Sequence, residues 1–479
     1  MQFDNSYLQL GERFFVKTQS KPVSNPKLLL WNDSLDEQLG LSELQESKRA
    51  QYFSGNELLE GSEPIALAYA GHQFGHYNPQ LGDGRAHLLG ELIDSDGTRK
   101  DIQLKGSGAT PFSRGGDGLC AIGPALREYL MSEAMFALGV PTTRCLSVVL
   151  TGEPVYRQRV HQGAIVTRIA SSHIRVGTFQ FIAAQQDKAT LQSLCDYVIN
   201  RHFPEVQQTD GDSICALFEA IMNKQIELIV EWLRVGFIHG VMNTDNTAIS
   251  GETIDFGPCA MLGTYDPETV YSSIDRRGRY AFGNQAKIAH WNMAKLAESL
   301  LVLDNEVSRL EPLQHALNQF QSKFEQAYFA MMSNKLGLLE TQEQDNTLIE
   351  KITQAMYQQQ LDYTQTFTLL TRSLNCEESE QKISKSLGDA YSTWYQRLKA
   401  SNHSLEDIQA HMRQVNPVVI PRNHQVEQVL AEYEDNNNIE PLLAFLNVLK
   451  QPYTDSEVSK VYQQADSEYD AQYQTFCGT

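Results

Sequence analysis

The sequence is poor in features that would place the protein in a membrane or outside a cell. It has no apolar run near the ~20 residues of a membrane-spanning helix. Its first residues, MQFDNSYLQLGERFF, lack the charged segment and apolar stretch of a secretory signal. The seven cysteines are scattered and include no C-x-x-C pair, which is unlike a disulfide framework or a zinc site. We therefore expect a soluble, cytoplasmic protein with reduced thiols and no membrane partner.

Positive charge is scarce as well. The chain carries 39 Lys and Arg against 59 Asp and Glu, a formal net charge of -20. Proteins that bind nucleic acid neutralise its phosphates with clustered Lys and Arg, and the one basic cluster here, Arg276-Arg277-Gly278-Arg279, is short. We interpret this cluster as a solvated loop or a phosphate contact, and we expect no nucleic-acid partner.

Glycine is almost missing from the second half of the chain. Only three of the 31 glycines follow Asn284, whereas twelve lie between Gly71 and Gly123. A glycine-rich stretch is typical of tight turns and close backbone approaches, as in loops that hold phosphates. The glycine-poor part is rich in Gln, Leu and Ala with helical periodicity. At 479 residues the chain is long enough for two or three lobes.

Apolar periodicity predicts the elements of the glycine-rich part. They are strands at 85–93, 100–106, 146–157 and 163–170 and a helix at 123–138. A turn at Asp96-Gly97 would join the first two strands into a hairpin, and a turn at Gly152 would join the last two. Further on, the apolar face of 221–237 predicts a long helix, and the β-branched pair Thr253-Ile254 predicts a short strand.

The stretch HGVMNTDNTAISGETIDFGPC, residues 239–259, has the pattern of a protein-kinase catalytic loop with one part replaced. A kinase reads H-R-D-x-x-x-x-N and later D-F-G. Here His239 is followed seven positions later by Asn246, and Asp255 opens a D-F-G nine positions after that. Val241 occupies the position of the catalytic Asp.

Phosphoryl chemistry needs a cation near the phosphates, hard oxygen ligands for a metal ion, and a group that accepts a proton. Lys105, at the end of a predicted strand, is the candidate cation, with Glu128 or Glu133 on the following helix as its partner. Taken alone, a lysine at a strand end is more often a surface residue. The hairpin before Lys105 and the acidic helix after it favour the functional reading.

Asn246 and Asp255 offer oxygen ligands of the kind that hold Mg²⁺ beside a nucleotide. The structural alternative is a buried turn stabilised by these two side chains. Asp245 is the only carboxylate between His239 and Ile249. It is therefore the candidate base.

Two glycine-rich loops flank the predicted hairpin, and neither is a Walker A motif. The loops and nearby arginines that we expect at a polyphosphate site are Gly82, Gly84 and Arg85, then Gly106, Gly108, Arg114, Gly115, Gly116, Asp117 and Gly118, and finally Arg168 and Arg175. His72 and His76 have the i, i+4 spacing of a metal pair, but the glycines beside them favour structural histidines. Cys477 could be redox-active, although a bystander thiol fits the sequence better.

Together these stretches resemble one family, the selenoprotein O (SelO)/YdiU family of pseudokinase-fold protein adenylyltransferases. The resemblance runs through AGHQFGHYNPQLGDGRA, IQLKGSGATPFSRGGDGLCAIGPALREYLMSEAM, VTRIASSHIRVGTFQ, GFIHGVMNTDN, DFGP and NPVVIPRN. These motifs are long and specific, and they cover most of the chain.

The resemblance implies an α+β, protein-kinase-like bilobal fold. A mixed β/α N-terminal lobe would occupy 1–180, the catalytic core of a mainly helical C-terminal lobe 181–300, and additional helices 301–479. ATP would bind turned around relative to a kinase, so that AMP is transferred to a Ser, Thr or Tyr hydroxyl of a partner protein.

The resemblance also implies roles for single residues. Asp245 would be the base, and Asn246 and Asp255 the ligands of Mg²⁺. The nucleotide contacts would be Gly82, Gly84, Arg85, Lys105, Asp117, Gly118, Arg168, Arg175 and Asp255. UTP and Mn²⁺ are implied as alternatives to ATP and Mg²⁺. One departure concerns Cys477, because this chain has no second Cys beside it and so lacks the Cys–selenocysteine pair of some members. An atypical kinase and an ATP-binding scaffold without catalysis remain the competing hypotheses.

Overall fold

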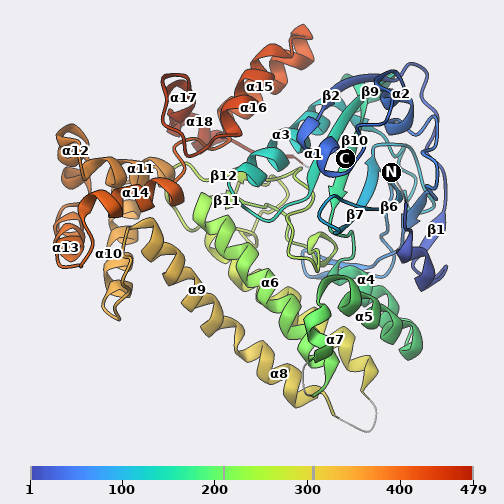
Figure 1. The fold of residues 1–479 in the computed structure, drawn as a ribbon, viewed down its shortest axis with the longest axis horizontal. Helices are drawn as coiled ribbons and strands as arrows, with labels where there is room; N and C mark the ends of the chain where they lie inside the picture. The colour runs from blue at the N-terminus through green and yellow to red at the C-terminus, as the bar shows by residue number, and fades with distance from the viewer. Residues whose placement is uncertain (1–2, 209–210, 305–307, 477–479) are drawn as a thin grey trace.

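The computed structural model describes residues 3–208, 211–304 and 308–476. The N-terminal part forms an antiparallel sheet with a few helices, and the C-terminal part is helical (Figure 1). The α+β class expected from the sequence is confirmed. The closer relationship to a two-lobed kinase, and the division of the chain at 180 and 300, stay predictions.

The elements follow the order sheet first, helices later. The strands are β1 (Phe15–Lys17), β2 (Lys27–Trp31), β3 (Ile65–Leu67), β4 (Gly71–Gln73), β5 (His76–Asn78), β6 (Ala86–Ile93), β7 (Arg99–Lys105), β8 (Cys120–Ala121), β9 (Arg144–Tyr156), β10 (Val160–Ala170), β11 (Phe237–Ile238) and β12 (Ala260–Met261). The helices up to residue 300 are α1 (Asp33–Gln38), α2 (Glu46–Phe53), α3 (Ile122–Ala137), α4 (Val176–Ala183), α5 (Lys188–His202), α6 (Ser213–Val235) and α7 (Gln285–Leu300). Those that follow are α8 (Leu310–Asn318), α9 (Phe320–Lys335), α10 (Asp345–Gln358), α11 (Tyr363–Ser373), α12 (Glu377–Leu387), α13 (Asp389–Lys399), α14 (Leu405–Val415), α15 (Asn423–Asn436), α16 (Glu440–Leu449), α17 (Glu457–Lys460) and α18 (Ser467–Gln472).

The large sheet has the strand order β1-β3-β6-β7-β10-β9-β2, with β8 beside β10. β6 and β7 form the predicted hairpin, and the amide of Gly97 closes its turn on the carbonyl of Asp94. β9 and β10 also pair, but the predicted turn at Gly152 is wrong, because the chain reverses at 157–159. Gly152 lies inside β9 with φ +75°, where a Cβ would stand 2.6 Å from that of Asn25. Glycine is needed at position 152 because the segment around Asn25 packs closely against it.

Alternate residues of β7 face opposite layers, as the pleat of a strand requires. Ile102 and Leu104 belong to a core that also contains residues of α1 and α2. Lys105 points the other way, toward α3, which packs on β9 and β10. Lys105 therefore meets Glu128 of α3 on this side of the sheet.

α6 leads the chain into the loop that begins at His239. Gly236 ends this helix in the left-handed conformation, with φ +78°. β11 then pairs with β12 on the return. The predicted strand at Thr253-Ile254 is wrong except for one isolated bridge between Thr253 and Thr142. The chain turns sharply at Asp255, so the segment is too short for a strand. Within the described ranges, no helix combines the length and apolar character needed to cross a membrane.

Candidate active site

One cavity of about 490 Å³ lies between the glycine-rich loops and the loop after His239. This volume is within the range of about 300–1,000 Å³ typical of ligand pockets. The cavity is lined by every residue to which the family resemblance assigns a nucleotide, metal or catalytic role: Gly82, Gly84, Arg85, Lys105, Asp117, Gly118, Arg168, Arg175, Asp245, Asn246 and Asp255. Of the other loop residues expected at a polyphosphate site, Arg114 and Gly116 line the cavity, whereas Gly106, Gly108 and Gly115 do not. The fold thus brings together segments that lie far apart in the sequence. Their chemical roles stay predictions.

Two cations and two carboxylates form a closed network at this cavity. Lys105 Nζ donates to Glu128 Oε2 at 2.7 Å and to Asp255 Oδ1 at 2.8 Å. Arg168 Nη2 donates to Glu128 Oε1 at 2.6 Å and to the same Asp255 oxygen at 2.7 Å. Burial opposes ionisation of both carboxyl groups, but the neighbouring cations outweigh it. They lower the pKa of Glu128 and hold the pKa of Asp255 well below its usual range.

The backbone at Asp255 adopts an unusual conformation. Its φ of +63° lies in the left-handed region, which Asp tolerates better than most residues other than glycine. His239 supports the turn, because its Nε2 donates to the carbonyl of Ile254 at 2.8 Å. Asp255 Oδ1 accepts from both cations, and among the described residues no donor contacts Oδ2. One carboxylate oxygen is therefore free to bind a ligand in the cavity.

Asp245 lies in the short 3₁₀ turn η3 (Thr244–Asn246) and is buried, although it lines the cavity. Its Oδ2 accepts one hydrogen bond, from Gln73 Nε2 at 3.2 Å, and its Oδ1 is buried without a partner among the described residues. Burial raises the pKa of Asp245 to about 6. Arg175 Nη1 donates to the backbone carbonyl of Asp245 at 2.9 Å and so fixes the turn rather than the carboxylate.

The β4–β5 hairpin holds η3 in place, a role that the sequence reading missed. The amide of His72 donates to Thr244 Oγ1 at 2.7 Å, and the amide of Phe74 donates to Asn243 Oδ1 at 3.1 Å. Gly71 passes so close that a Cβ would lie 2.5 Å from Asp245 Oδ1. The repeated glycines of AGHQFGH are the feature of the sequence that could have indicated this role, because they mark a close backbone approach.

The histidines of this hairpin do not form a metal pair. His72 Nδ1 shares a hydrogen bond of 2.8 Å with Gln180 Nε2, and His76 is exposed. The expectation of a structural histidine is therefore supported for His72 only.

Asn246 and Asp255 fit a Mg²⁺ ion that also binds a nucleotide. Asn246 Nδ2 donates to the carbonyl of Val241 at 2.9 Å, which leaves its amide oxygen as the free end of the side chain. Together with Asp255 Oδ2, this makes two hard oxygen donors at one cavity. Mg²⁺ commonly takes one or two protein oxygens and completes its octahedron with phosphates and water. Consistent with so few protein ligands, the described residues contain no cluster of three or more His, Cys, Asp or Glu side chains that could hold a metal.

The glycine-rich loops form the opposite wall of the cavity. Gly82 has φ +76°, and a Cβ there would collide with the ring of Phe112 at 2.3 Å. Gly118 has φ +70°, and a Cβ there would lie 2.2 Å from the carbonyl group of Gly108. Neither position can hold a side chain without a shift of the loop. Gly82 is thus required by the packing of the two loops against each other, and Gly118 by the packing of the second loop on itself.

Asp117 forms an ion pair that could not be predicted from the sequence. It forms two hydrogen bonds with Arg157 at 2.7 and 3.0 Å, and these bonds lower the pKa of Asp117. Arg157 also lines the cavity. It lies just after β9, in the connection that the sequence placed at Gly152, so the misplaced turn concealed it.

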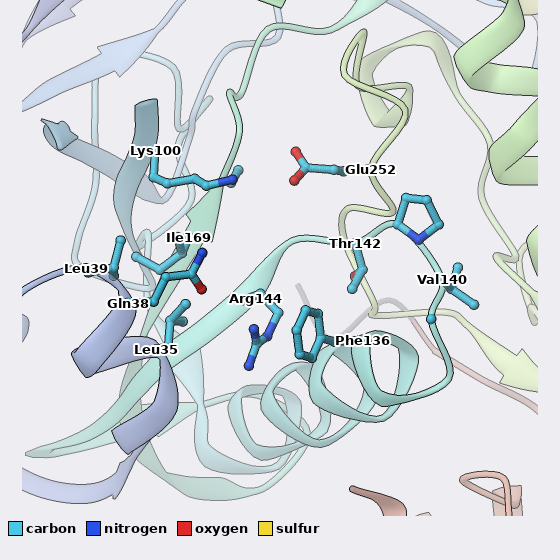
Figure 2. A pocket seen from close by; sticks show the side chains of 13 residues that line it. Leu35, Gln38, Leu39, Lys100, Phe136, Val140, Thr142, Arg144, Ile169 and Glu252 are labelled. Atoms are coloured by element: carbon cyan, nitrogen blue, oxygen red, sulfur yellow. The ribbon is translucent and has the colours of Figure 1, made fainter. Parts of the chain in front are cut away.

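A second cavity, of about 320 Å³, is lined by α1, the end of α3 and the loop that contains Glu252 (Figure 2). It contains none of the predicted site residues. Its Arg144 makes two hydrogen bonds of 2.6 Å to Glu133 and stacks on Phe136. Glu133 therefore pairs with Arg144 and not with Lys105. Of the two partners predicted for Lys105, only Glu128 is confirmed.

The described cysteines, Cys120, Cys145, Cys195, Cys215, Cys259 and Cys376, are all free. They agree with the expectation of reduced thiols. Cys477, for which the sequence left a redox role open, lies outside the described residues.

Comparison with known proteins agrees with the motifs. The family described as Protein adenylyltransferase SelO matches residues 1–450. A protein of Teredinibacter turnerae named protein nucleotidyltransferase YdiU is 50% identical, with all of both chains covered. The proteins of the same name from Alcanivorax borkumensis and Anoxybacillus flavithermus are 49% and 50% identical. Each match covers all of this chain, with 98% and 99% of those proteins' lengths, respectively.

Proposed function

The chain belongs to the SelO family, and from this premise we propose that it is a protein adenylyltransferase. It transfers AMP from ATP to a Ser, Thr or Tyr hydroxyl of another protein and releases pyrophosphate. The names of its relatives support nucleotidyl transfer to protein. The choice of AMP and of hydroxyl acceptors rests on the site itself and on the resemblance of its motifs.

The observation that carries the proposal is the position of the carboxylate in the loop after His239. Val241 is buried, lines the cavity and offers only methyl groups where a kinase has its catalytic carboxylate. Asp245 lines the same cavity with a carboxylate oxygen that has no hydrogen-bond partner in the described part of the chain. The cavity retains cations and candidate metal ligands but lacks the kinase base. A base at a different position favours reaction at a different phosphorus.

In this reaction Asp245 accepts the proton of the acceptor hydroxyl. The resulting oxygen nucleophile forms a bond to the α-phosphorus of ATP, and the bond from that phosphorus to the bridging oxygen of pyrophosphate breaks. Negative charge accumulates on the departing pyrophosphate. Lys105, Arg168 and Arg175 are preorganised cations at the cavity and stabilise that charge.

Asn246 and Asp255 would hold the Mg²⁺ ion, with Mn²⁺ as the alternative. Once bound, the ion neutralises charge on the phosphates and orients them. Glu128 keeps Lys105 and Arg168 in place between the sheet and α3, so the protein cations need no rearrangement of the fold to meet a nucleotide.

A double-label experiment tests the proposal. The protein is incubated with acceptor proteins and ATP labelled at either the α or the γ phosphate. We expect stable label on hydroxyl side chains from α-labelled ATP only. Label from γ-labelled ATP alone would make the protein an atypical kinase, and no label from either would favour the scaffold. A parallel incubation with α-labelled UTP decides between the nucleotides.

A further inference from the structure

A basic and aromatic surface adjoins the candidate active site. It is formed by the loop segment 274–280 and by one face of α7. Arg276, Arg277 and Arg279 crowd into four positions of the loop, and Lys287 stands on the helix. None of these four side chains forms an ion pair with any described residue. In a chain of net charge -20, such a group of uncompensated cations is a local exception.

Aromatic rings connect this surface to the cavity. Phe74 lines the cavity, and its ring centroid is 5.1 Å from that of Tyr280. The Arg279 guanidinium lies over the ring of Trp291, 4.7 Å from its centroid, and over Tyr280 at 5.7 Å. Ile274 lines the cavity and is 47% exposed. The cationic loop is thus continuous with the cavity wall that carries Asp245.

The described carboxylates near these cations form no ion pair with them. Asp275 is buried and accepts hydrogen bonds from the backbone amides of Arg279 and Tyr280. Glu298 pairs with Lys295 at 2.6 Å. Arg279 Nε is buried and has no hydrogen-bond partner among the described residues. Arg276 and Arg277, by contrast, are exposed, and their guanidinium groups offer donors that an incoming anionic group can reach.

The nucleotide does not need these cations. Lys105, Arg168 and Arg175 already line the cavity for its phosphates, whereas Arg276 and Arg277 are exposed outside it. We propose that the surface docks the acceptor protein through an acidic segment next to the hydroxyl that is modified. This inference rests on the proposed function and names its substrate class. Elsewhere the negative charge of the chain repels acidic proteins, so a local positive surface orients them toward Asp245.

The first test measures peptide binding, independent of catalysis. A fluorescent peptide with one central tyrosine flanked by glutamates is titrated with the full-length protein, and the matched peptide carries glutamines instead. We expect the glutamate peptide to bind about tenfold more tightly at low salt and to lose that advantage as salt is raised. Equal binding of the two peptides would overturn the proposal.

The second test reverses charge on the surface. In Arg276→Glu/Arg277→Glu we expect the affinity for the glutamate peptide to fall about tenfold, with ATP affinity unchanged. The matched control is Lys382→Glu/Lys385→Glu on α12, two exposed lysines that do not line the cavity. Unchanged peptide affinity in the loop variant would contradict the proposal. So would an equal loss in both variants, because the effect would then be one of net charge.

Two further readouts separate the alternatives. A single-stranded oligonucleotide that binds the surface more tightly than the glutamate peptide would assign it to nucleic acid and overturn the inference. Label from α-labelled ATP on the peptides reports on the proposed function separately. If the glutamate peptide binds at the surface but is never labelled, the docking inference holds and the adenylyl-transfer proposal fails.

Discussion

Asp245 and Asp255 lie in the same cavity but in opposite electrostatic surroundings. Asp255 accepts from Lys105 and Arg168, which stabilise its charge, whereas Asp245 is buried with one amide donor. The first environment suits a permanent anion that binds a metal, and the second suits a group that gains and loses a proton. Substitution of each residue should therefore have a distinct signature.

For Asp245→Asn we expect nucleotide binding to be kept and turnover to fall by about 10²–10⁴, the range for loss of a general base. Asn preserves the shape of the side chain, so η3 should stay folded. Calorimetric titration with ATP and Mg²⁺ measures the binding, and α-label transfer measures the turnover. A variant with near-normal turnover would show that the proton is accepted elsewhere.

For Asp255→Ala we expect loss of metal-dependent nucleotide binding together with activity. We also expect a loss of about 1–3 kcal/mol in the free energy of unfolding, because Lys105 and Arg168 would then share one carboxylate. Calorimetry and urea denaturation are the measurements. Asp117→Ala is the control for the stability measurement alone, because the ion pair of Asp117 with Arg157 is at the surface and its loss should change the free energy of unfolding by less than about 1 kcal/mol. Unchanged Mg·ATP affinity in Asp255→Ala would make Asp255 a structural turn residue.

At the scale of elements, the β4–β5 hairpin supports the turn that carries Asp245. We expect Gly71→Ala to lower turnover by about tenfold or more, because its methyl group would push the carboxylate out of place and small misplacements are costly in catalysis. ATP affinity should stay nearly constant. His76→Ala, an exposed position on the same hairpin, should behave as wild type. Equal turnover in the two variants would show that the hairpin does not position Asp245.

Some elements could be predicted from the sequence because their signals are local. The β6–β7 hairpin follows from alternation around Asp96-Gly97, and α3 follows from helical periodicity with a glycine at its end. α6 is predicted over 221–237 from its apolar face, although the helix begins earlier, at Ser213. The spacing of His239, Asn246 and Asp255 indicated a phosphate site for the same reason. Each of these depends on residues close together in the chain.

Other features could not be predicted, because they depend on contacts between distant segments. Gln73 reaches Asp245 across 172 positions of the chain, and nothing in a single sequence reports that pairing. Gly152 reads as a turn, yet its real partner is Asn25. Placing the turn there also hid Arg157 from the cavity. A glycine in the sequence does not show which distant segment approaches it.

At the scale of the whole molecule, the site depends on segments from both ends of the chain. The C-terminal segment returns to the loop that follows Asp255. Thr475 Oγ1 donates to the carbonyl of Pro258 at 2.7 Å, and the amide of Thr475 donates to the carbonyl of Tyr271 at 2.8 Å. The amide of Ser273 donates back to Thr475 at 3.0 Å. The loop at 258–273, which follows Asp255, is therefore held by hydrogen bonds to Thr475.

We accordingly expect a chain that ends at Gln464 to fold, yet to bind Mg·ATP more weakly and to lose about tenfold or more in turnover, because the loop after Asp255 would no longer be held in place. Thermal unfolding, calorimetry and label transfer measure the three effects. A chain that ends at Phe476 is the matched control, since it keeps Thr475 and removes Cys477. It should match the full chain under both reducing and oxidising conditions. Full activity in the shorter chain would show that the loop holds itself, and a redox response lost only with Cys477 would assign that thiol a regulatory role.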